Sequence, residues 1–360
     1  MKSWLPLVGK ALVSILLITC FGLFGDLGPT AEGAYGSNHA ASAEVVSPVN
    51  ANLDNQWALG KTGWLQVWPV TSWDTPSVVV AVLDTGIDRD HEDLIGEVVA
   101  EVNFSDSPVA DDLHGHGTHI AGIIAADADN GVGINGLAPG SLLMNVKVAD
   151  DRGRCDAEAV AAGIVWAVDN GANILNISLC LSEPSQALEE AIAYAWSHGA
   201  VIIAAAGNSG DSAPQYPAYY HQVIAVTATR EDGSRAPLAS YGDWVDVAAP
   251  GYQIYSTLPD NEYGYKTGTS QAAAYVTGLA AFLYSIATDS DGDGWVNDEV
   301  RSAIESSCQQ IDGSGMGNGL VDWTKAVSQL QYYESHPQSP LWQPGNETLH
   351  WPTLLRLFQF

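Results

Sequence analysis

Runs of consecutive apolar residues alternate with stretches of helical spacing over most of the chain. The runs predict strands at 78–83, 142–148, 174–179, 201–206 and 223–228, and the helical patterns lie at 157–168, 186–197 and 271–284. Strands that are apolar at every position, rather than at alternate positions, are buried on both faces. We therefore predict an α/β fold in which a mostly parallel central β-sheet is flanked by helices on both faces, as a three-layer sandwich.

Polar residues follow two of these predicted strands. Asp84 comes directly after the run at 78–83, and Asn208 comes shortly after the run at 201–206. The carboxyl ends of parallel strands meet at one edge of a sheet, and α/β proteins form their sites there. This edge is therefore the place where we expect a functional site.

Residues 1–33 have the features of an export signal. Lys2 and Lys10 flank the start of an apolar run at 11–24, which is too short and too interrupted by glycine for a membrane span. We therefore expect a secreted, extracellular protein. Small-residue patterns suited to cleavage follow at 31–33 and 41–43.

Two alternatives would keep the protein at a membrane. One is a retained N-terminal anchor, and the other is a lipid on Cys20, although Thr19 is a poor match to the position before a lipidated cysteine. Beyond the signal, the composition predicts three further parts. These are a small, polar linker at 34–49, a folded domain at 50–330 and a tail rich in proline and aromatic residues at 331–360.

The charge of the chain limits its partners. Its 360 residues include 42 acidic and 13 basic residues, which gives a net charge of −29. A surface of this kind repels nucleic acid and anionic membranes, so we expect neither as a partner, while bound cations are favoured. Hydrophobic residues make up 46% of the chain, which is enough for a well-buried core. We expect the protein to be a monomer.

Three short strings present an acid, a base and a nucleophile beside small residues. They are Asp-Thr-Gly-Ile at 84–87, His-Gly-Thr-His-Ile-Ala-Gly at 116–122 and Gly-Thr-Ser-Gln-Ala at 268–272. Each alone has an ordinary explanation as a strand end, a helix start or a turn. Together, in the order Asp, His, Ser, they resemble the subtilisin-like serine peptidases over roughly residues 50–330.

The resemblance implies a role for each member of this set. Ser270 would be the nucleophile, near the N-terminus of the helix predicted from 271, where developing negative charge is stabilised. His116 would be the general base, and Asp84 would fix its tautomer and stabilise its charged form. Asn208, in the string Ala-Ala-Gly-Asn-Ser-Gly at 205–210, would donate a hydrogen bond to the oxyanion. We assign the neighbouring His114 and His119 to packing.

The resemblance also implies where a polypeptide substrate binds, as an added strand between two short edges. The pocket for the first side chain lacks an acid, so we expect apolar or aromatic side chains there. The matching edge residues are Arg152, Gly153 and Arg154 on one side and Ser178, Leu179 and Cys180 on the other, and the pocket residues are Ala205, Ala206, Gly207 and Gln215.

The cysteines leave two possibilities open. Beyond Cys20, the chain has Cys155, Cys180 and Cys308, which allow one disulfide and a spare thiol, or three unpaired cysteines. Cys155 and Cys180 lie near the substrate edges, where the family commonly has glycine. A disulfide between them would stiffen or obstruct the pocket.

Ser270 is followed by Gln-Ala-Ala-Ala-Tyr at 271–275, where the family pattern is Met-Ala-X-Pro-His. Gln271 replaces the methionine, which removes an oxidisable thioether, and Ala274 replaces the proline, which restores a backbone N–H. The second change keeps a transpeptidase or macrocyclase open as an alternative. A catalytically silent calcium-binding interaction module is the other alternative to a secreted serine endopeptidase that acts through an acyl-enzyme.

Ca²⁺ is the cofactor that the resemblance implies. The family's strong site uses an N-terminal residue, an aspartate soon after the catalytic one and a loop of carbonyl groups. Oxygen ligands of this kind suit a hard cation. The matching ligands are the side chains of Asn50, Asp93 and Asn130 and the backbone oxygens of Asp127, Val132 and Ile134.

A second candidate for Ca²⁺ lies near the C-terminal end of the domain. Asp289, Asp291 and Asp293 follow the EF-hand spacing of positions 1, 3 and 5, with glycine at position 6. Position 12 is Val300 instead of glutamate, so Asp298 or Glu299 would have to complete the shell. The alternative is a solvated acidic loop.

Overall fold

The computed structural model describes residues 50–68, 78–128 and 130–336. The predicted export signal, the linker and most of the predicted tail lie outside these residues. The strands are β1 (Val79–Asp84), β2 (Val98–Asn103), β3 (Leu142–Lys147), β4 (Ile174–Ile177), β5 (Val201–Ala205), β6 (Val223–Thr229), β7 (Val247–Pro250), β8 (Ile254–Leu258) and β9 (Glu262–Lys266). The helices are α1 (Trp57–Lys61), α2 (Trp64–Val67), α3 (Gly117–Ala125), α4 (Ala157–Asp169), α5 (Gln186–Ser197), α6 (Thr269–Ile286), α7 (Asn297–Ser306) and α8 (Trp323–Ser335), with a 3-10 turn at Leu53–Asn55.

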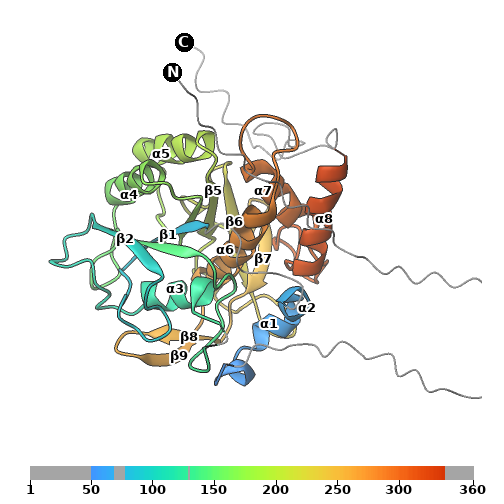
Figure 1. Ribbon diagram of the computed structural model, residues 1–360. Helices are drawn as coiled ribbons and strands as arrows, with labels where there is room; N and C mark the ends of the chain where they lie inside the picture. Colours follow the sequence, from blue (N-terminus) through green and yellow to red (C-terminus); the bar gives the residue numbers. More distant parts are fainter. Residues whose placement is uncertain (1–49, 69–77, 129, 337–360) are drawn as a thin grey trace, which may run out of the picture. The chain divides into compact units, whose positions relative to one another are not determined.

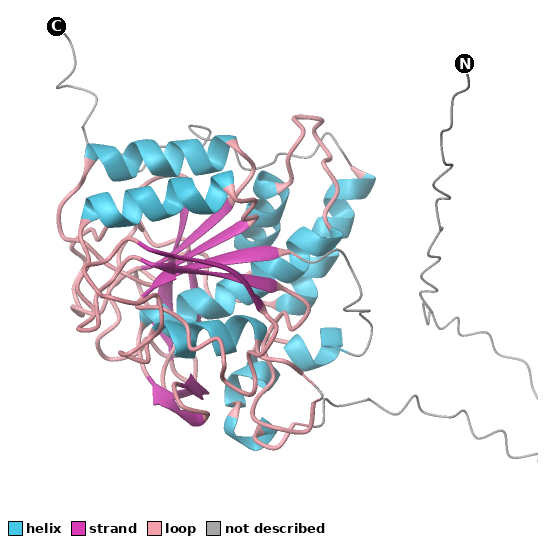
Figure 2. Cartoon of the chain, turned by 60° about the vertical axis from the view of Figure 1, so that its left-hand side comes forward, coloured by secondary structure: helices cyan, strands magenta, loops and turns pink. Residues whose placement is uncertain are grey.

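Seven strands form one parallel sheet in the order β2-β3-β1-β4-β5-β6-β7. Helices α4 and α5 pack on one face, and α3 and α6 pack on the other (Figures 1 and 2). The predicted α/β fold with a mostly parallel sheet between helical layers is therefore confirmed.

The alternation of side chains along β1 explains why its sequence is apolar throughout. Val80 and Val82 belong to the core beneath α3 and α6, whereas Ala81 and Leu83 belong to the core beneath α4 and α5. All four are almost completely buried. Because successive side chains point to opposite faces, a strand between two cores has no polar position available.

Helix α6 runs through the larger core and is buried along most of its length. Small residues permit this close packing: a Cβ at Gly278 would overlap the side chain of Leu137. The helix begins at Thr269, not at the predicted Gln271, because extended Gly268 forms its N-cap. Ser270 therefore lies within the first turn of the helix.

Several parts of the fold had no expected counterpart, among them an edge strand, a hairpin and the last helix of the described residues. Strand β2 lies at the edge of the sheet, and β8 and β9 form a separate antiparallel hairpin that packs near α3. Helix α8 extends past residue 330, where we expected the tail to begin, because Leu330 and Tyr333 are buried against the core.

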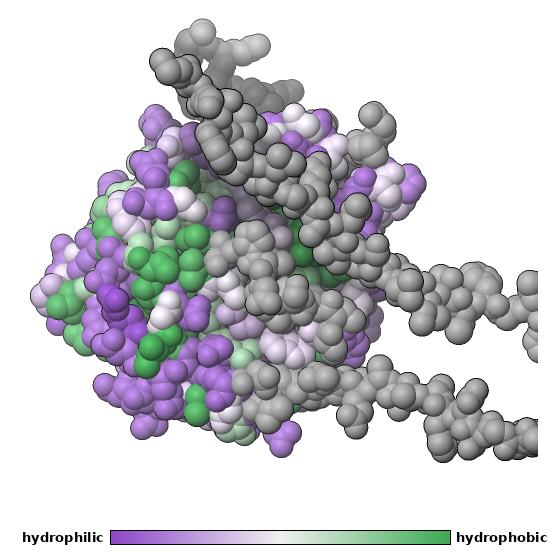
Figure 3. All heavy atoms as spheres, in the orientation of Figure 1, coloured by the Kyte–Doolittle hydropathy of each residue, from purple (hydrophilic) through white to green (hydrophobic). Residues whose placement is uncertain are grey.

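Hydrophilic side chains surround smaller apolar areas on the face of the molecule shown in Figure 3. This fits the strongly acidic composition. Within the described ranges, no helix combines the length and the apolar character needed to cross a bilayer.

Candidate active site

The carboxyl ends of three adjacent strands form the base of the site. Asp84 is the last residue of β1, Ser178 follows β4, and Asn208 lies three residues beyond the end of β5. These strands are neighbours in the sheet, and α6 packs on β4 and β5. Residues that are far apart in the sequence therefore meet at the edge that the sequence pattern indicated.

Asp84 and His116 form a close pair. The Nδ1 atom of His116 lies 2.7 Å from Oδ1 of Asp84, whose carboxylate is completely buried. Oδ1 also accepts a hydrogen bond from the backbone N–H of Thr85, at 2.7 Å. Burial lowers the pKa of His116, but the charge and hydrogen bond of Asp84 outweigh it, so that the pKa is raised above its ordinary value.

A second buried acid, Asp112, organises the loop that carries His116. Its Oδ1 accepts hydrogen bonds from the hydroxyl of Thr85 and the N–H of Gly115, both at 2.8 Å. Its Oδ2 accepts from the N–H and hydroxyl of Thr118, at 2.8 and 2.7 Å. We did not single out Asp112 from the sequence, and its position four residues before His116 was the only signal available.

The approach of α3 to β1 requires glycine directly after the histidine. A Cβ at Gly117 would overlap the backbone oxygen of Gly86 and would lie 3.2 Å from Oδ1 of Asp84. The Gly-Thr-His string therefore has a steric reason. It lets the helix start close enough for the imidazole to reach the carboxylate.

Ser270 is 7% exposed and faces the end of β4. Its hydroxyl donates to the backbone oxygen of Ser178 at 3.3 Å, and the hydroxyl of Ser178 donates to the backbone oxygen of Ser270 at 3.2 Å. The side-chain NH₂ of Asn176 donates to the Ser178 hydroxyl at 3.0 Å. This network fixes the first turn of α6 against β4, with free backbone N–H groups near the Ser270 side chain.

Asn208 lies exposed beside the same turn. Its amide oxygen accepts from the backbone N–H of Thr269 at 2.9 Å, and the hydroxyl of Thr269 accepts from the N–H of Gly207 at 3.0 Å. A Cβ at Gly268 would lie 3.2 Å from the Asn208 nitrogen. The NH₂ group of Asn208 thus lies close to the backbone that carries Ser270.

The residues predicted for the first pocket also come together. Gly207 lies against Gln215, since a Cβ there would be 2.9 Å from the Gln215 Cγ atom, and Cys180 donates through its thiol to the backbone oxygen of Ala205 at 3.4 Å. Ala205 and Ala206 are buried at the end of β5. Leu181 pairs with Tyr216 in an antiparallel bridge, which joins the segment 178–181 to the segment that contains Gln215.

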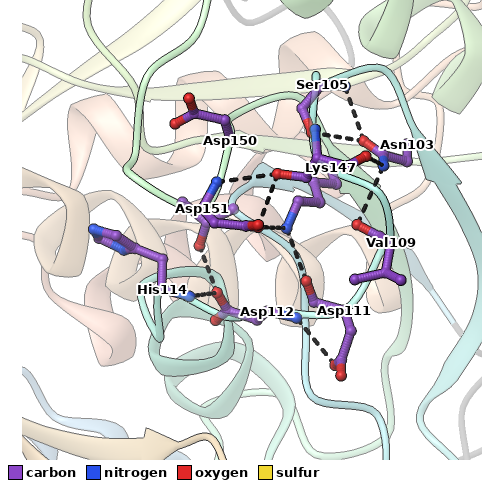
Figure 4. Close-up of polar contacts among 12 residues, drawn as sticks. Asn103, Ser105, Val109, Asp111, Asp112, His114, Lys147, Asp150 and Asp151 are labelled. Atoms are coloured by element: carbon purple, nitrogen blue, oxygen red, sulfur yellow. Dashed lines mark hydrogen bonds and ion pairs between the residues drawn. The ribbon is translucent and has the colours of Figure 1, made fainter.

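The other predicted edge is a tight, exposed turn. Asp150 accepts from the N–H groups of Arg152 and Arg154, both at 2.9 Å, and Gly153 has a left-handed φ of 72°. Buried Lys147 anchors this turn: its Nζ atom donates to Asp151 Oδ1 at 2.7 Å and to the backbone oxygen of Asp111 at 2.8 Å (Figure 4). Lys147 is a positioning residue that the sequence pattern did not single out.

Cys155, Cys180 and Cys308 are free thiols in the described part of the chain. Burial raises the pKa of Cys155 to about 11 and that of Cys180 to about 12, even though part of Cys180 is exposed. Both thiols are therefore protonated at neutral pH, which makes them weak nucleophiles.

Comparison with known proteins agrees with this geometry. A sequence model described as "Subtilase family" matches residues 75–326. The chain belongs to the subtilase family.

Its relatives within that family are serine proteases. The chain is 42% identical to the thermophilic serine proteinase of Bacillus sp. strain AK1 over 249 residues, which are 69% of the chain and 60% of that relative. It is 40% identical to thermitase of Thermoactinomyces vulgaris over 73% of the chain and 92% of thermitase. The match to a solved protease structure from Pseudoalteromonas arctica covers 79% of this chain and 99% of the chain in that structure, with a TM-score of 0.71 and 28% sequence identity. The chain is thus an enzyme of the subtilisin-like serine endopeptidase type.

The first predicted cation site of this subtilase is a cluster of converging oxygen atoms. The NH₂ group of Asn50 is held by the backbone oxygens of Asp127 and Ile134, at 3.1 and 2.6 Å. The NH₂ group of Asn130 is held by Oδ1 of Asp93 at 3.0 Å. Val132 lies in the same loop, where its N–H donates to the Asn130 oxygen at 2.9 Å, and Asp129 lies outside the described residues.

This oxygen cluster fits a hard cation. A Cβ at Gly133 would overlap the carboxylate of Asp93, so the loop wraps closely around that acid. Burial raises the pKa of Asp93, although hydrogen bonds from Asn130 and from the backbone N–H of Ile134 oppose this shift. With a cation among these oxygens, half a turn of either amide would direct its oxygen, instead of its NH₂ group, toward the ion. The turn would give up the hydrogen bonds that the N–H groups of Gly131 and Val132 donate to the two amide oxygens.

The second predicted cation site contains more acids than the EF-hand spacing indicated. Asp289, Asp291 and Asp293 are exposed, and carboxylate oxygens from all three lie within 4.8 Å of one another. Asp291 also lies within 4.8 Å of the buried acids Asp298 and Glu299. Burial and the neighbouring Glu299 raise the pKa of Asp298 to about 8.

Proposed function

We propose that this subtilase is an exported endopeptidase that hydrolyses peptide bonds of polypeptides through an acyl-enzyme. The observation that carries the proposal is the 2.7 Å contact between His116 and Asp84, at the sheet edge that also holds Ser270 and Asn208. A base paired in this way with a buried acid is the arrangement that activates a serine hydroxyl.

The reaction follows from these positions. The Ser270 hydroxyl first turns away from the backbone oxygen of Ser178. Its Oγ atom then attacks the carbonyl carbon of the scissile peptide, and its proton passes to Nε2 of His116. Asp84 accepts from Nδ1 and stabilises the imidazolium. The oxyanion accepts hydrogen bonds from the NH₂ group of Asn208 and the backbone N–H of Ser270. His116 then gives its proton to the amine, which leaves as the C–N bond breaks. A water molecule next attacks the acyl carbon and gives a proton to His116. His116 returns this proton to Ser270 Oγ as the bond between the acyl group and Ser270 breaks.

The substrate is an extended polypeptide that pairs with the segments 152–154 and 178–180 as an added strand. The first side chain enters the pocket formed by 205–207 and Gln215. Small and uncharged pocket residues favour an apolar or aromatic side chain in that position. The fixed turn at Asp150 and the anchored Lys147 keep the edge at 152–154 in place before the substrate arrives.

The first oxygen cluster is proposed to hold Ca²⁺. Asn50, Asp93 and Asn130 would supply side-chain oxygens, and Asp127, Val132 and Ile134 would supply backbone oxygens. The bound ion would neutralise the buried charge of Asp93 and would tie the segment at residue 50 to the loop that follows α3. The ion acts on stability and takes no part in the reaction steps.

One experiment tests the proposed reaction directly. The purified chain and its Ser270→Ala variant are incubated in Ca²⁺ with a protein substrate in H₂¹⁸O, and the products are analysed by mass spectrometry. We expect ¹⁸O at the new carboxyl ends with the parent chain and no cleavage with the variant. Products joined to an added amine would identify a transpeptidase. Equal cleavage by the two proteins, or none by either, would refute the proposal.

A further inference from the structure

Two acidic side chains at the start of α7 are buried without sufficient hydrogen bonds. Asp298 is 5% exposed and Glu299 is fully buried. Asp298 Oδ1 and Glu299 Oε2 are both buried without a hydrogen-bond partner, although Oε1 of Glu299 accepts from the N–H and hydroxyl of Ser290. Leaving one carboxylate oxygen unpaired inside a protein is costly, and two adjacent acids double the cost.

These buried acids face the exposed acidic loop directly before them. Ligand atoms of Asp291, Asp298 and Glu299 all lie within 4.8 Å of one another, and so do those of Asp289, Asp291 and Asp293. Asp291 is common to the two groups. The two sets therefore form one continuous cluster of five carboxylates around Asp291.

We propose that these five carboxylates form a divalent cation site, separate from the cluster at Asp93, that binds Ca²⁺. All the ligand atoms are oxygens, which suits a hard cation. Five carboxylates can supply the six to eight oxygen ligands that Ca²⁺ accepts, whereas Mg²⁺ requires a tighter octahedral set and retains water. The unpaired oxygens of Asp298 and Glu299 would become ligands.

The position of α7 explains why the site departs from the EF-hand pattern. The helix begins at Asn297, and Val300 is fully buried in the core. The residue at position 12 of the loop therefore packs away from the acids, and Glu299 at position 11 turns toward Asp291 instead. A search for the EF-hand glutamate at position 12 overlooks this ligand.

The loop is also attached to the central layers of the fold. The ring of Trp295 lies on Gly199, where a Cβ would overlap it, and the Asn297 NH₂ group donates to the backbone oxygen of Trp196 at 3.1 Å. Trp196 lies in the last turn of α5, and Gly199 lies in the turn between α5 and β5, the strand that leads to Asn208. A cation here would thus fix the start of α7 to the turn between α5 and β5. This inference does not depend on peptidase activity.

Terbium luminescence tests the site, because Tb³⁺ binds calcium sites and is excited by a nearby tryptophan. Trp295 lies within the loop, and its backbone N–H donates to Asp293 Oδ1 at 2.8 Å. The full chain carrying Ser270→Ala, which prevents self-cleavage, is titrated with Tb³⁺ and then with Ca²⁺. We expect strong sensitised Tb³⁺ emission, which should fall when Ca²⁺ displaces the bound Tb³⁺. Most of the emission should also be lost in Trp295→Phe.

Matched variants assign the emission and the number of bound ions. Asp298→Asn removes a buried ligand, Asp291→Asn removes an exposed ligand with little risk to folding, and Asp312→Asn makes the same charge change at an exposed acid outside the cluster. Bound Ca²⁺ is counted by equilibrium dialysis, with Asp93→Asn to remove the first cluster. We expect Asp291→Asn and Asp298→Asn each to lose one bound ion and the emission that depends on Trp295. The variants Asp312→Asn and Asp93→Asn should keep that emission. Unchanged ion number and emission in folded Asp291→Asn would overturn the proposal.

Discussion

Asn208 and Thr269 are joined by two hydrogen bonds that leave one end of the Asn208 amide free for a substrate. The Asn208 oxygen accepts from the backbone N–H of Thr269 at 2.9 Å and from its hydroxyl at 3.3 Å. Since the oxygen is engaged by Thr269, the NH₂ group is the end of the amide that is left for other partners. The residue directly before Ser270 thus orients the proposed oxyanion donor.

Replacing Asn208 by leucine should reduce turnover and leave substrate binding nearly unchanged. A lost donor to the oxyanion costs on the order of 3 kcal/mol, the value known for subtilisin, which corresponds to a fall in kcat of about 10²–10³-fold. Steady-state kinetics on a fluorogenic peptide measure kcat and KM separately. Thr269→Ser, which keeps both donors to the Asn208 oxygen, is the matched control and should retain most of the activity. A kcat of Asn208→Leu equal to that of the parent would remove Asn208 from the mechanism.

The pH dependence of activity should report the pair formed by His116 and Asp84. The pKa of His116 is raised because the charge and hydrogen bond of Asp84 outweigh the effect of burial. The base must be neutral to accept a proton, so kcat/KM should rise with pH with a midpoint above the ordinary value of 6.5.

The variant Asp84→Asn isolates the contribution of the acid. It should lower the midpoint of this acidic limb, because the charge that favours the imidazolium is gone. It should also reduce kcat by about 10⁴-fold, since the wrong tautomer of His116 becomes favoured. An acidic limb that stays at the same pH in Asp84→Asn would contradict the assignment.

His119 should make the protein less stable in acid. Its Nε2 atom lies 3.1 Å from the backbone oxygen of Ile254, and burial lowers its pKa to about 3. Between pH 6.5 and about 3, the unfolded chain binds a proton that the folded chain does not bind. The free energy of unfolding should therefore fall as the pH falls through this range, by up to about 1.4 kcal/mol per pH unit from this group.

Urea unfolding at several pH values measures this slope. The comparison is between Ser270→Ala and the double variant Ser270→Ala/His119→Gln, so that the contributions of other groups cancel. The double variant should be less stable at neutral pH but should lose stability less steeply in acid. Equal slopes for the two proteins would show that His119 titrates normally.

Activity should survive mild treatment with hydrogen peroxide. Gln271, 2% exposed, occupies the position directly after Ser270, and the described methionines Met144 and Met316 are each 3% exposed. The thiols near the cleft are held protonated by their raised pKa values, which slows their oxidation.

The variant Gln271→Met provides the matched comparison for oxidation. It places a thioether beside the nucleophile and should lose most of its activity under conditions in which the parent keeps most of its own. Residual activity is followed against time of exposure to peroxide, with intact mass to detect the added oxygen. Rapid loss in the parent without modification of Ser270 or His116 would contradict the prediction.

The fold, and the strand ends at which two of the proposed catalytic residues lie, could be predicted from the sequence because they rest on local patterns. Uninterrupted apolar runs such as 201–206 identify strands buried on two faces, and Asp84 and Asn208 are placed by the strand ends that they follow. The helix at 186–197 was predicted with the bounds that α5 has, since Ser185 supplies a typical N-cap.

Other features depend on contacts between distant segments and could not be predicted in this way. Asp112 and Lys147 are ordinary charged residues in the sequence, and only the packing of loops on β1 and β3 makes them the anchors of the site. Strand β2 has apolar and polar residues without a buried face, so its pattern is weak. The sequence left open whether Asp298 or Glu299 would complete the second cation site, because that depends on the residue at which α7 begins, which local pattern sets only to within a few positions.

The central claim is that Asp84 and His116 activate Ser270, and labelling by a fluorophosphonate probe tests it most directly. The purified chain is treated with the probe in Ca²⁺ and measured by intact mass and peptide mapping, beside Ser270→Ala and Asp84→Asn. The account predicts one label per chain on Ser270, none on Ser270→Ala and greatly slowed labelling of Asp84→Asn. An unlabelled parent chain, or labelling of Asp84→Asn at the parental rate, would contradict it.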